Sequence, residues 1–416
     1  MDKTELYDLV IIGAGAAGMM AAIAAAEGGI KVLILEKLPK IATKLKATGG
    51  GKCNISNTLA NEAFMEAFGR EGRFMQYALE SLDQQALRDF FATLGIETDV
   101  LDGLRIFPVG HQSQSIIGAL ANEISRLGVV IHCNSKIMKT VYTDKNFNVY
   151  TNKEVYQTPK LIIATGGKGY PQLGAEGDGY KLAASLGHSF HMPHPAMMPL
   201  KVAEQWVNHC CADTIAKARI IVDIKKYKNY RAVGDLIFTK GGIRGPVVLD
   251  FSREITPLLA KLKEVPILIN ITKGMSEEEI RTHIKSKLSD SKHYNTLQLV
   301  ETLLPSSISQ VICTMANINP ALGFAKQSGV SRAKLIKLLA WTPLTIIGHD
   351  GFDKAMITRG GIKLKEINSR TMESKLVEGL YFCGEVVDLD GPCGGYNLQW
   401  AFSSGYLAGS STLSKI

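Results

Sequence analysis

The sequence predicts an α/β fold in which a domain built on a parallel sheet is divided by a β-rich insertion. Tyr7–Ile12 is a continuous apolar run, typical of a strand buried on both faces of a parallel sheet, and a glycine-rich turn and an alanine-rich segment follow it. Glycine-rich segments recur near the other end of the chain, while short apolar runs occupy its middle. A chain of 416 residues has room for two or three domains of roughly 100–200 residues each.

Composition indicates a folded protein without a membrane span. Hydrophobic residues make up 46% and charged residues 21% of the chain, which excludes a disordered scaffold. Leu9–Ala26 carries no charge, but three glycines interrupt it and acidic residues precede it, so a strand–turn–helix is expected there. The seven cysteines are scattered and form no CxxC pair, which predicts no disulfide framework, no metal site and a cytoplasmic protein.

The first element is a Rossmann-like dinucleotide unit. Gly13–Gly18 matches G-x-G-x-x-G, Met19–Glu27 is predicted to be a helix, and Lys31–Leu35 is predicted to be the second strand. The glycines allow the tight turn, the approach of a pyrophosphate and close helix packing, while the helix N-terminus attracts the phosphates. Glu36 ends the second strand and can accept hydrogen bonds from a ribose, but it would repel a 2′-phosphate, which argues against NADP.

Three more segments have the character of cofactor loops. Lys44–Asn54 contains three consecutive glycines, which suit a loop along a flat ligand. Ala164–Gly167 follows the predicted strand Leu161–Ile163; it is either a strand end turning toward the insertion or, slightly favoured, a contact with the cofactor. Tyr381–Asp388 and the following Gly391–Ala401 are predicted to form a strand, a loop, a Gly-Gly turn and a helix.

These segments resemble the motifs of one flavoprotein family. The motifs lie around Lys44–Asn57, Arg105–Pro108, Ala164–His188 and Gly384–Gly409. On them the chain resembles the HI0933/YhiN-type family, which includes BaiN-type bile-acid reductases and aminoacetone oxidase-like proteins, and more distantly the fumarate reductase flavoproteins. Thr43 stands where the family usually has Arg. The resemblance implies a FAD-binding domain of the two-dinucleotide-binding-domain type, split by a β-barrel-like domain that carries a helical subdomain.

The resemblance also implies noncovalent FAD and its contacts. The last motif is expected to open a helix toward the flavin pyrimidine edge, where a helix N-terminus stabilises the negative charge of reduced flavin. The cofactor-binding residues predicted in this way are Gly13, Ala14, Gly15, Ala16, Ala17, Gly18, Glu36, Lys37, Lys44, Thr48, Gly49, Gly50, Gly51, Cys53, Asn54, Ile137, Ala164, Thr165, Gly166, Gly384, Glu385, Asp388, Gly395, Tyr396, Asn397 and Leu398.

The middle of the chain is predicted to be the insertion. The expected boundaries are 1–192 and 353–416 for the two parts of the FAD domain, 193–275 for the β-rich domain, 276–340 for the helical subdomain and 341–352 for a return strand. The predicted strands are Ile220–Ile224, Leu236–Thr239, Val247–Leu249, Pro266–Ile271 and Thr342–Gly348, and the predicted helices are 277–289, 296–303, 306–315 and 331–340.

The net charge of +8 lies mostly in residues 201–300, where 17 basic residues face 11 acidic ones. Within them, Lys225–Arg231 interleaves basic and aromatic residues, which could suit single-stranded nucleic acid. An exposed hairpin is the favoured interpretation, so a nucleic-acid partner is not expected. The sequence carries no signal of oligomeric state.

Few residues in the sequence indicate a catalytic role beyond that of the flavin. The candidate catalytic residues are Tyr170 and Tyr396, which could donate a proton or simply pack, and Arg105, which could bind a carboxylate or pair with an acid of its own domain. Cys53 could react with flavin or pair with Cys393, but an inert buried thiol is favoured. The preferred function is two-electron oxidation or reduction of a small organic substrate. A flavoprotein that acts on nucleic acid and a flavin-binding sensor are the alternatives. There is no second G-x-G-x-x-G unit, so NAD(P)H would act only as a transient electron donor.

Overall fold

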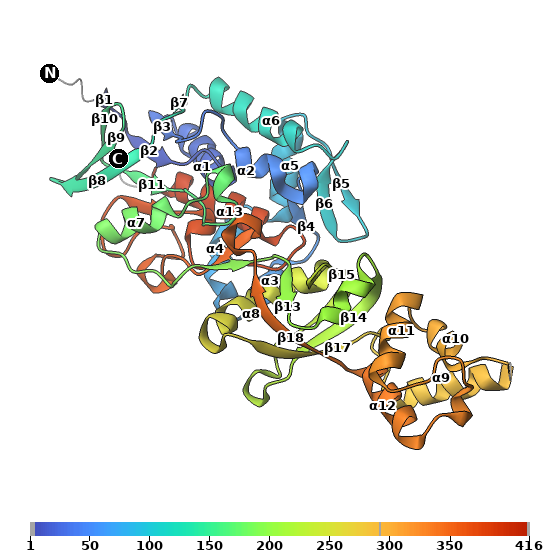
Figure 1. Cartoon of the computed structure of the whole chain (residues 1–416). Helices are drawn as coiled ribbons and strands as arrows, with labels where there is room; N and C mark the ends of the chain where they lie inside the picture. Colours follow the sequence, from blue (N-terminus) through green and yellow to red (C-terminus); the bar gives the residue numbers. More distant parts are fainter. Residues whose placement is uncertain (1–4, 291–292, 414–416) are drawn as a thin grey trace. The chain divides into compact units, whose positions relative to one another are not determined.

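The computed structural model describes residues 5–290 and 293–413. By their internal contacts the residues divide into two compact units (Figure 1). The first unit combines Met1–Pro195 with Met356–Ile416, so it is built from both ends of the chain. The second unit is Ala196–Ala355. Among the described residues, no helix is long and apolar enough to cross a membrane.

A five-stranded sheet forms the centre of the first unit, and every neighbouring pair of strands in it is parallel. Its three central strands are completely buried, which explains why the sequence shows continuous apolar runs there. The Rossmann-like unit predicted from the sequence is therefore confirmed. The strand order is β20 (Leu380–Phe382), β11 (Leu161–Ile163), β2 (Leu9–Ile12), β3 (Val32–Leu35) and β7 (Val130–His132).

Two helices from opposite ends of the chain, α1 (Ala16–Ala26) and α13 (Tyr396–Ser411), pack against each other (Figure 1). A Cβ added at Gly405 would lie 2.3 Å from the carbonyl oxygen of Ala17, and one at Gly409 would lie 2.1 Å from that of Ala21. Because a real Cβ atom does not approach so closely, these glycines allow the two backbones to touch. The contact joins the amino-terminal and carboxy-terminal parts of the first unit.

Smaller sheets and helices complete the first unit. One sheet has the order β1 (Glu5–Leu6), β10 (Val155–Thr158), β9 (Asn146–Thr151) and β8 (Ile137–Thr143), another has β4 (Ser56–Asn57), β6 (Arg105–Pro108) and β5 (Thr98–Leu101), and β12 (His194–Ala196) pairs with β19 (Ile357–Arg359). The further helices are α2 (Thr43–Ala47), α3 (Asn61–Glu66), α4 (Gln76–Ser81), α5 (Gln84–Thr93), α6 (Ser113–Arg126) and α7 (Asp178–Ser185).

The second unit is a closed antiparallel barrel with attached helices, as the resemblance implied. Helices α9 (Glu277–Asp290), α10 (Thr296–Glu301), α11 (Ser306–Met315) and α12 (Gly329–Ala340) all lie in the chain between the last two strands and gather together (Figure 1). The barrel order is β13 (Leu200–Val202), β16 (Gly242–Arg244), β15 (Arg231–Thr239), β14 (Thr214–Val222), β17 (Val265–Asn270) and β18 (Thr342–His349).

One predicted strand of the second unit is wrong. Val247–Leu249 lies at the start of α8 (Pro246–Leu262), a helix of 17 residues. Val247, Phe251 and Ile255 recur every four residues and are buried, so they form the apolar stripe of a helix. Three apolar residues alone cannot distinguish a strand from a helix. The assignment depends on the four-residue repeat of buried residues that continues along the helix. Pro246 suits the first helical position, where no backbone N–H is needed.

Candidate functional site

The turn between β2 and α1 is shaped by its glycines. Gly13 is left-handed (φ +105°), and a Cβ on Gly18 would lie 1.9 Å from the carbonyl oxygen of Gly13. At Gly15, by contrast, an added Cβ would meet no atom of the described residues within 4 Å. No side chain caps the N-terminus of α1. Open space beside uncapped N–H groups at a helix N-terminus is what a pyrophosphate requires.

Glu36 follows β3 and is fixed by the backbone. One carboxylate oxygen accepts a hydrogen bond from the N–H of Ala14 at 2.9 Å, and the other accepts one from the N–H of Leu38 at 2.9 Å. These bonds join the carboxylate to the glycine turn and hold it at the edge of the sheet. A carboxylate oxygen can accept more than one hydrogen bond, so Glu36 retains acceptor capacity for ribose hydroxyls.

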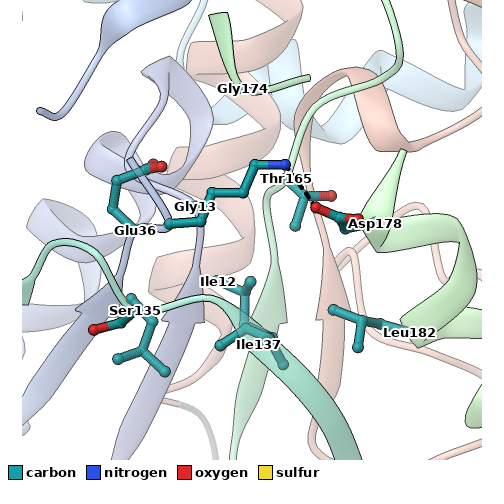
Figure 2. Close-up of a pocket in the computed structure, with 11 residues that line it drawn as sticks. Ile12, Gly13, Glu36, Ser135, Ile137, Thr165, Gly174, Asp178 and Leu182 are labelled. Carbon is teal, nitrogen blue, oxygen red and sulfur yellow. Dashed lines mark hydrogen bonds and ion pairs between the residues drawn. The ribbon is translucent and has the colours of Figure 1, made fainter. Parts of the chain in front are cut away.

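A pocket of about 460 Å³, counted with its open mouth, lies at this edge. Figure 2 shows Glu36 and Asp178 on opposite sides of the pocket, with Ile137 below them. The hydroxyl of Thr165 is buried and has no hydrogen-bond partner among the described residues. The lining residues are Ile12, Gly13, Leu35, Glu36, Lys37, Ser135, Ile137, Thr165, Gly174, Asp178 and Leu182.

The loop of three glycines is a left-handed turn after α2. Gly49, Gly50 and Gly51 have φ values of +57°, +66° and +91°, a conformation that glycine adopts without strain. Cys53 follows this turn and is fully buried. Burial raises the pKa of the Cys53 thiol to about 11, so the thiol stays protonated at neutral pH and is a poor nucleophile. This result supports the interpretation of Cys53 as an inert thiol.

A polar junction joins segments that are far apart in the chain. The Nζ of Lys44 lies 2.7 Å from Oε2 of Glu385, and Oε1 of Glu385 accepts a hydrogen bond from the N–H of Thr358 at 2.8 Å. The hydroxyl oxygen of Thr358 accepts hydrogen bonds from the N–H groups of Lys168 and Gly169 at 2.7 and 3.2 Å. Helix α2 and the loops after β11 and β20 are thereby tied together, with Thr358 of β19 between the two loops.

The N-terminus of α13 is held by two amide side chains. With its amide oriented to match its neighbours, Asn54 donates to the carbonyls of Ser56 and Ile106 and accepts from the N–H of Gly395. Asn397 accepts from the N–H of Gly391 at 2.8 Å and donates to the same residue's carbonyl at 2.9 Å. The turn that opens α13 is therefore held from both sides.

The candidate catalytic residues occupy three different environments. The Tyr396 ring is 9% exposed and packs against Phe64, with ring centroids 4.9 Å apart. Tyr170 is left-handed (φ +57°) and precedes a short 3-10 turn. Arg105 lies 2.7 Å from Asp102 on the same exposed hairpin. Arg105 thus pairs with an acid of its own domain, which is one of the two roles expected for it.

The remaining predicted residues are distributed around the edge of the parallel sheet. Ala164 packs under the glycine turn, where a Cβ on Gly13 would lie 2.6 Å from its carbonyl oxygen. Gly384 and Gly166 are left-handed, Asp388 pairs with His191, and Leu398 packs against the core. In the described residues, no group of three or more His, Cys, Asp or Glu side chains is placed to hold a metal.

Sequence reasoning missed several residues of the site. Asp178 and Gly174 lie in the segment that carries the third family motif, so the motif could have indicated them. Ser135, Leu182 and Thr358 carry no sequence signal of their own. Their place at the site depends on which strand ends come together.

The fold and these converging loops define the class: a Rossmann-type, FAD-dependent oxidoreductase. The chain belongs to the HI0933-like family, whose Rossmann-domain profile matches residues 7–411. The resemblance stated from the motifs is therefore confirmed.

Relatives match along almost the whole chain. The 3-dehydro-bile acid delta(4,6)-reductase of Clostridium scindens is 31% identical over 401 residues, which cover 96% of this chain and 97% of the reductase. A ribosomal RNA dihydrouridine synthase of Haemophilus influenzae is 30% identical over 407 residues, which cover 97% of this chain and 98% of the synthase. The solved structure of 3-ketosteroid delta1-dehydrogenase from Sterolibacterium denitrificans, in complex with 1,4-androstadiene-3,17-dione, has a TM-score of 0.56 at 13% identity. It covers 99% of this chain and all of the dehydrogenase, and it shows a likeness of fold.

Proposed function

We propose that this protein uses FAD to reduce a carbon–carbon double bond conjugated to a carbonyl group in a small organic substrate. The observation that carries the proposal is the convergence of the Gly13–Gly18 turn, Glu36 and the loops after β11 and β20 at one edge of the parallel sheet. In doubly wound sheets this edge, at the carboxyl ends of the strands, is where nucleotides bind.

The two full-length relatives support the choice of chemistry. One is named as a reductase of a 3-dehydro bile acid, and the other as a synthase of dihydrouridine in ribosomal RNA. Both names describe hydrogen added across a double bond of a ring that also carries a carbonyl group. The substrates differ greatly in size, so the shared chemistry is a better guide than either substrate.

The chain's own groups have defined roles in this proposal. The uncapped N–H groups at the start of α1 bind the pyrophosphate, and Glu36 accepts hydrogen bonds from the adenosine ribose. Ile137 and Leu182 give the adenine an apolar surface. The N-terminus of α13 stabilises negative charge on the flavin half. When bound, the flavin supplies hydride chemistry, and a reduced nicotinamide nucleotide is the proposed electron donor.

RNA is the second candidate substrate, and one observation favours it. The hairpin between β14 and β15 exposes Lys225, Lys226, Lys228 and Arg231. Between them, Tyr227 and Tyr230 stack with ring centroids 5.7 Å apart. Basic groups around stacked aromatic rings can bind phosphates and bases of single-stranded RNA. The sequence of Lys225–Arg231 does form an exposed hairpin, as expected, and its charge leaves this second candidate open to test.

The experiment is anaerobic reduction of the FAD-loaded protein followed by mixing with possible oxidants. Flavin absorbance reports reoxidation. A steroid enone and a small cyclic enone are expected to reoxidise the flavin, whereas the matched saturated ketones are not. If uridine-containing RNA reoxidises it and no enone does, RNA replaces the small substrate. Failure of every carbonyl-conjugated alkene would refute the proposed chemistry.

A charge variant separates the two substrates further. Lys225→Gln combined with Lys226→Gln and Lys228→Gln is expected to leave enone reduction unchanged. The matched control neutralises three exposed lysines of the first unit, Lys139, Lys145 and Lys153. If the hairpin variant alone loses activity on RNA, the second candidate gains direct support.

A further inference from the structure

Lys37 forms an ion-pair bridge across the mouth of the pocket. It follows Glu36 directly, and its Nζ lies 2.7 Å from Oε2 of Glu176 and 2.6 Å from Oδ2 of Asp178. The Lys37 side chain is 18% exposed. Burial alone would lower the pKa of Lys37, but hydrogen bonds to Asp178 and Glu176 outweigh burial and raise it, so the ammonium stays charged. In Figure 2 the dashed line that ends on Asp178 marks this hydrogen bond, on the side of the pocket opposite Glu36.

The segment that carries the two acids is shaped for this contact. Tyr170, Gly174 and Gly177 are all left-handed, with φ values of +57°, +98° and +82°. At Gly174 the segment touches the residue that follows Lys37: an added Cβ would lie 2.8 Å from the Cδ1 of Leu38. Asp178 is the first residue of α7, where the helix N-terminus stabilises a carboxylate. The two acids are therefore held in place by the backbone that carries them.

The bridge changes what Lys37 can bind. A basic residue near the acidic residue at this strand end is the group that accommodates a 2′-phosphate in NADP-binding proteins. Lys37 has the charge for that role, but two carboxylates occupy its ammonium. Together with Glu36, which precedes Lys37 in the chain, the two acids give this region three carboxylates and one ammonium. A 2′-phosphate would be repelled there, while an unmodified ribose would not.

We propose that Glu176 and Asp178 are the residues that select the dinucleotide. They prevent Lys37 from receiving a 2′-phosphate, and the same bridge slows the departure of a bound adenosine. The inference rests on the proposed function, because it assumes that the pocket holds the adenosine half of FAD.

The test displaces FAD from the full-length holoprotein with adenine nucleotides. ADP, AMP and adenosine 2′,5′-bisphosphate are titrated separately, and released FAD is measured by its fluorescence. AMP is the matched comparison, because it differs from the bisphosphate only by the 2′-phosphate. In the wild type, AMP is expected to displace FAD at a concentration at least about tenfold lower than the bisphosphate, because the carboxylates around Lys37 repel the 2′-phosphate. In the double variant Glu176→Gln/Asp178→Asn, this preference is expected to shrink about tenfold.

Two further variants identify the cause. Adding Lys37→Gln to the double variant is expected to remove the gain in bisphosphate binding, because the receiving cation is gone. The control variant Glu62→Gln/Glu97→Gln removes two exposed carboxylates outside the pocket and is expected to behave like the wild type. The FAD dissociation rate is expected to rise about two- to fivefold in the double variant, as for partly exposed ion pairs, and to increase with salt in the wild type.

The possible results distinguish failure of the selection role of Glu176 and Asp178 from failure of the proposed function. If ADP does not displace FAD from the wild type, the placement of adenosine in this pocket fails, and the proposed function fails with it. If ADP displaces FAD but the preference is the same in the double variant, the selection role of Glu176 and Asp178 is overturned. If the double variant does not fold, the single variant Asp178→Asn replaces it. The nucleotide preference is then expected to shrink in the same direction by a smaller factor.

Discussion

The contact between α1 and α13 leads to a specific prediction, because the two helices can approach so closely only where α13 carries glycine, which has no Cβ. In Gly409→Ala the new Cβ would lie 2.1 Å from the carbonyl oxygen of Ala21, so the helices must separate by about 0.9 Å to reach 3.0 Å. Overpacking of this kind costs roughly 1–3 kcal/mol, and alanine returns about 1 kcal/mol of helix propensity. We expect a net loss of up to about 2 kcal/mol in the free energy of unfolding.

The assay is urea unfolding followed by circular dichroism, with Gly118→Ala as the matched control. Gly118 is also inside a helix, α6, but an added Cβ there meets no atom of the described residues within 4 Å. Gly118→Ala is therefore expected to stabilise the protein by about 0.5–1 kcal/mol. If both substitutions stabilise the protein equally, the packing of α1 on α13 is not as described.

Three other predictions concern buried groups. Burial lowers the pKa of His188, and the carboxylate of Glu366 only partly opposes this, so stability from neutral His188 is complete above about pH 6.5 and is lost as the pH falls below it. The urea midpoint should fall less steeply on acidification in His188→Gln. Cys53 should resist iodoacetamide at pH 7.5 while the exposed Cys211 is alkylated, as read by mass spectrometry. Thr358→Val should cost about 1–3 kcal/mol because two backbone N–H groups lose their acceptor, and Thr358→Ser should restore most of it.

Each of these predictions has a contradicting result. An unchanged acid profile in His188→Gln would mean that this histidine is not buried in neutral form. Alkylation of Cys53 at the rate of Cys211 would contradict its burial. Equal stability of the valine and serine variants would show that the hydroxyl of Thr358 does not support the junction.

The local parts of the fold could be predicted because their signals are local. The strand before Gly13, the turn and the helix after it lie within one short window, so spacing alone identified them. Val247–Leu249 shows where local signals fail. Three apolar residues fit the two-residue repeat of a strand and the 3.6-residue repeat of a helix, and only the buried stripe that continues to Ile255 indicates a helix.

Residues of the site could be predicted from the sequence where a single structural requirement calls for one residue type. Glu36 and the glycine turn are examples, since an acid after the second strand and a turn without Cβ atoms have clear physical reasons. Asn54 and Lys37 were expected to contact the cofactor from their motif positions alone. In the structure, Asn54 hydrogen-bonds the start of α13. Lys37 pairs with Glu176 and with Asp178, the first residue of α7. Such roles depend on tertiary contacts that spacing does not reveal.

The central claim is that segments from both ends of the chain form one FAD site, and FAD binding to Glu36→Ala tests it most directly. Wild-type protein reconstituted with FAD should bind one equivalent, which acid should release because no covalent bond holds it. Glu36→Ala should raise the dissociation constant by at least about tenfold, because the ribose hydroxyls would lose a charged hydrogen-bond acceptor. An unchanged dissociation constant would contradict the ribose assignment, and wild-type protein that binds no FAD would contradict the account as a whole.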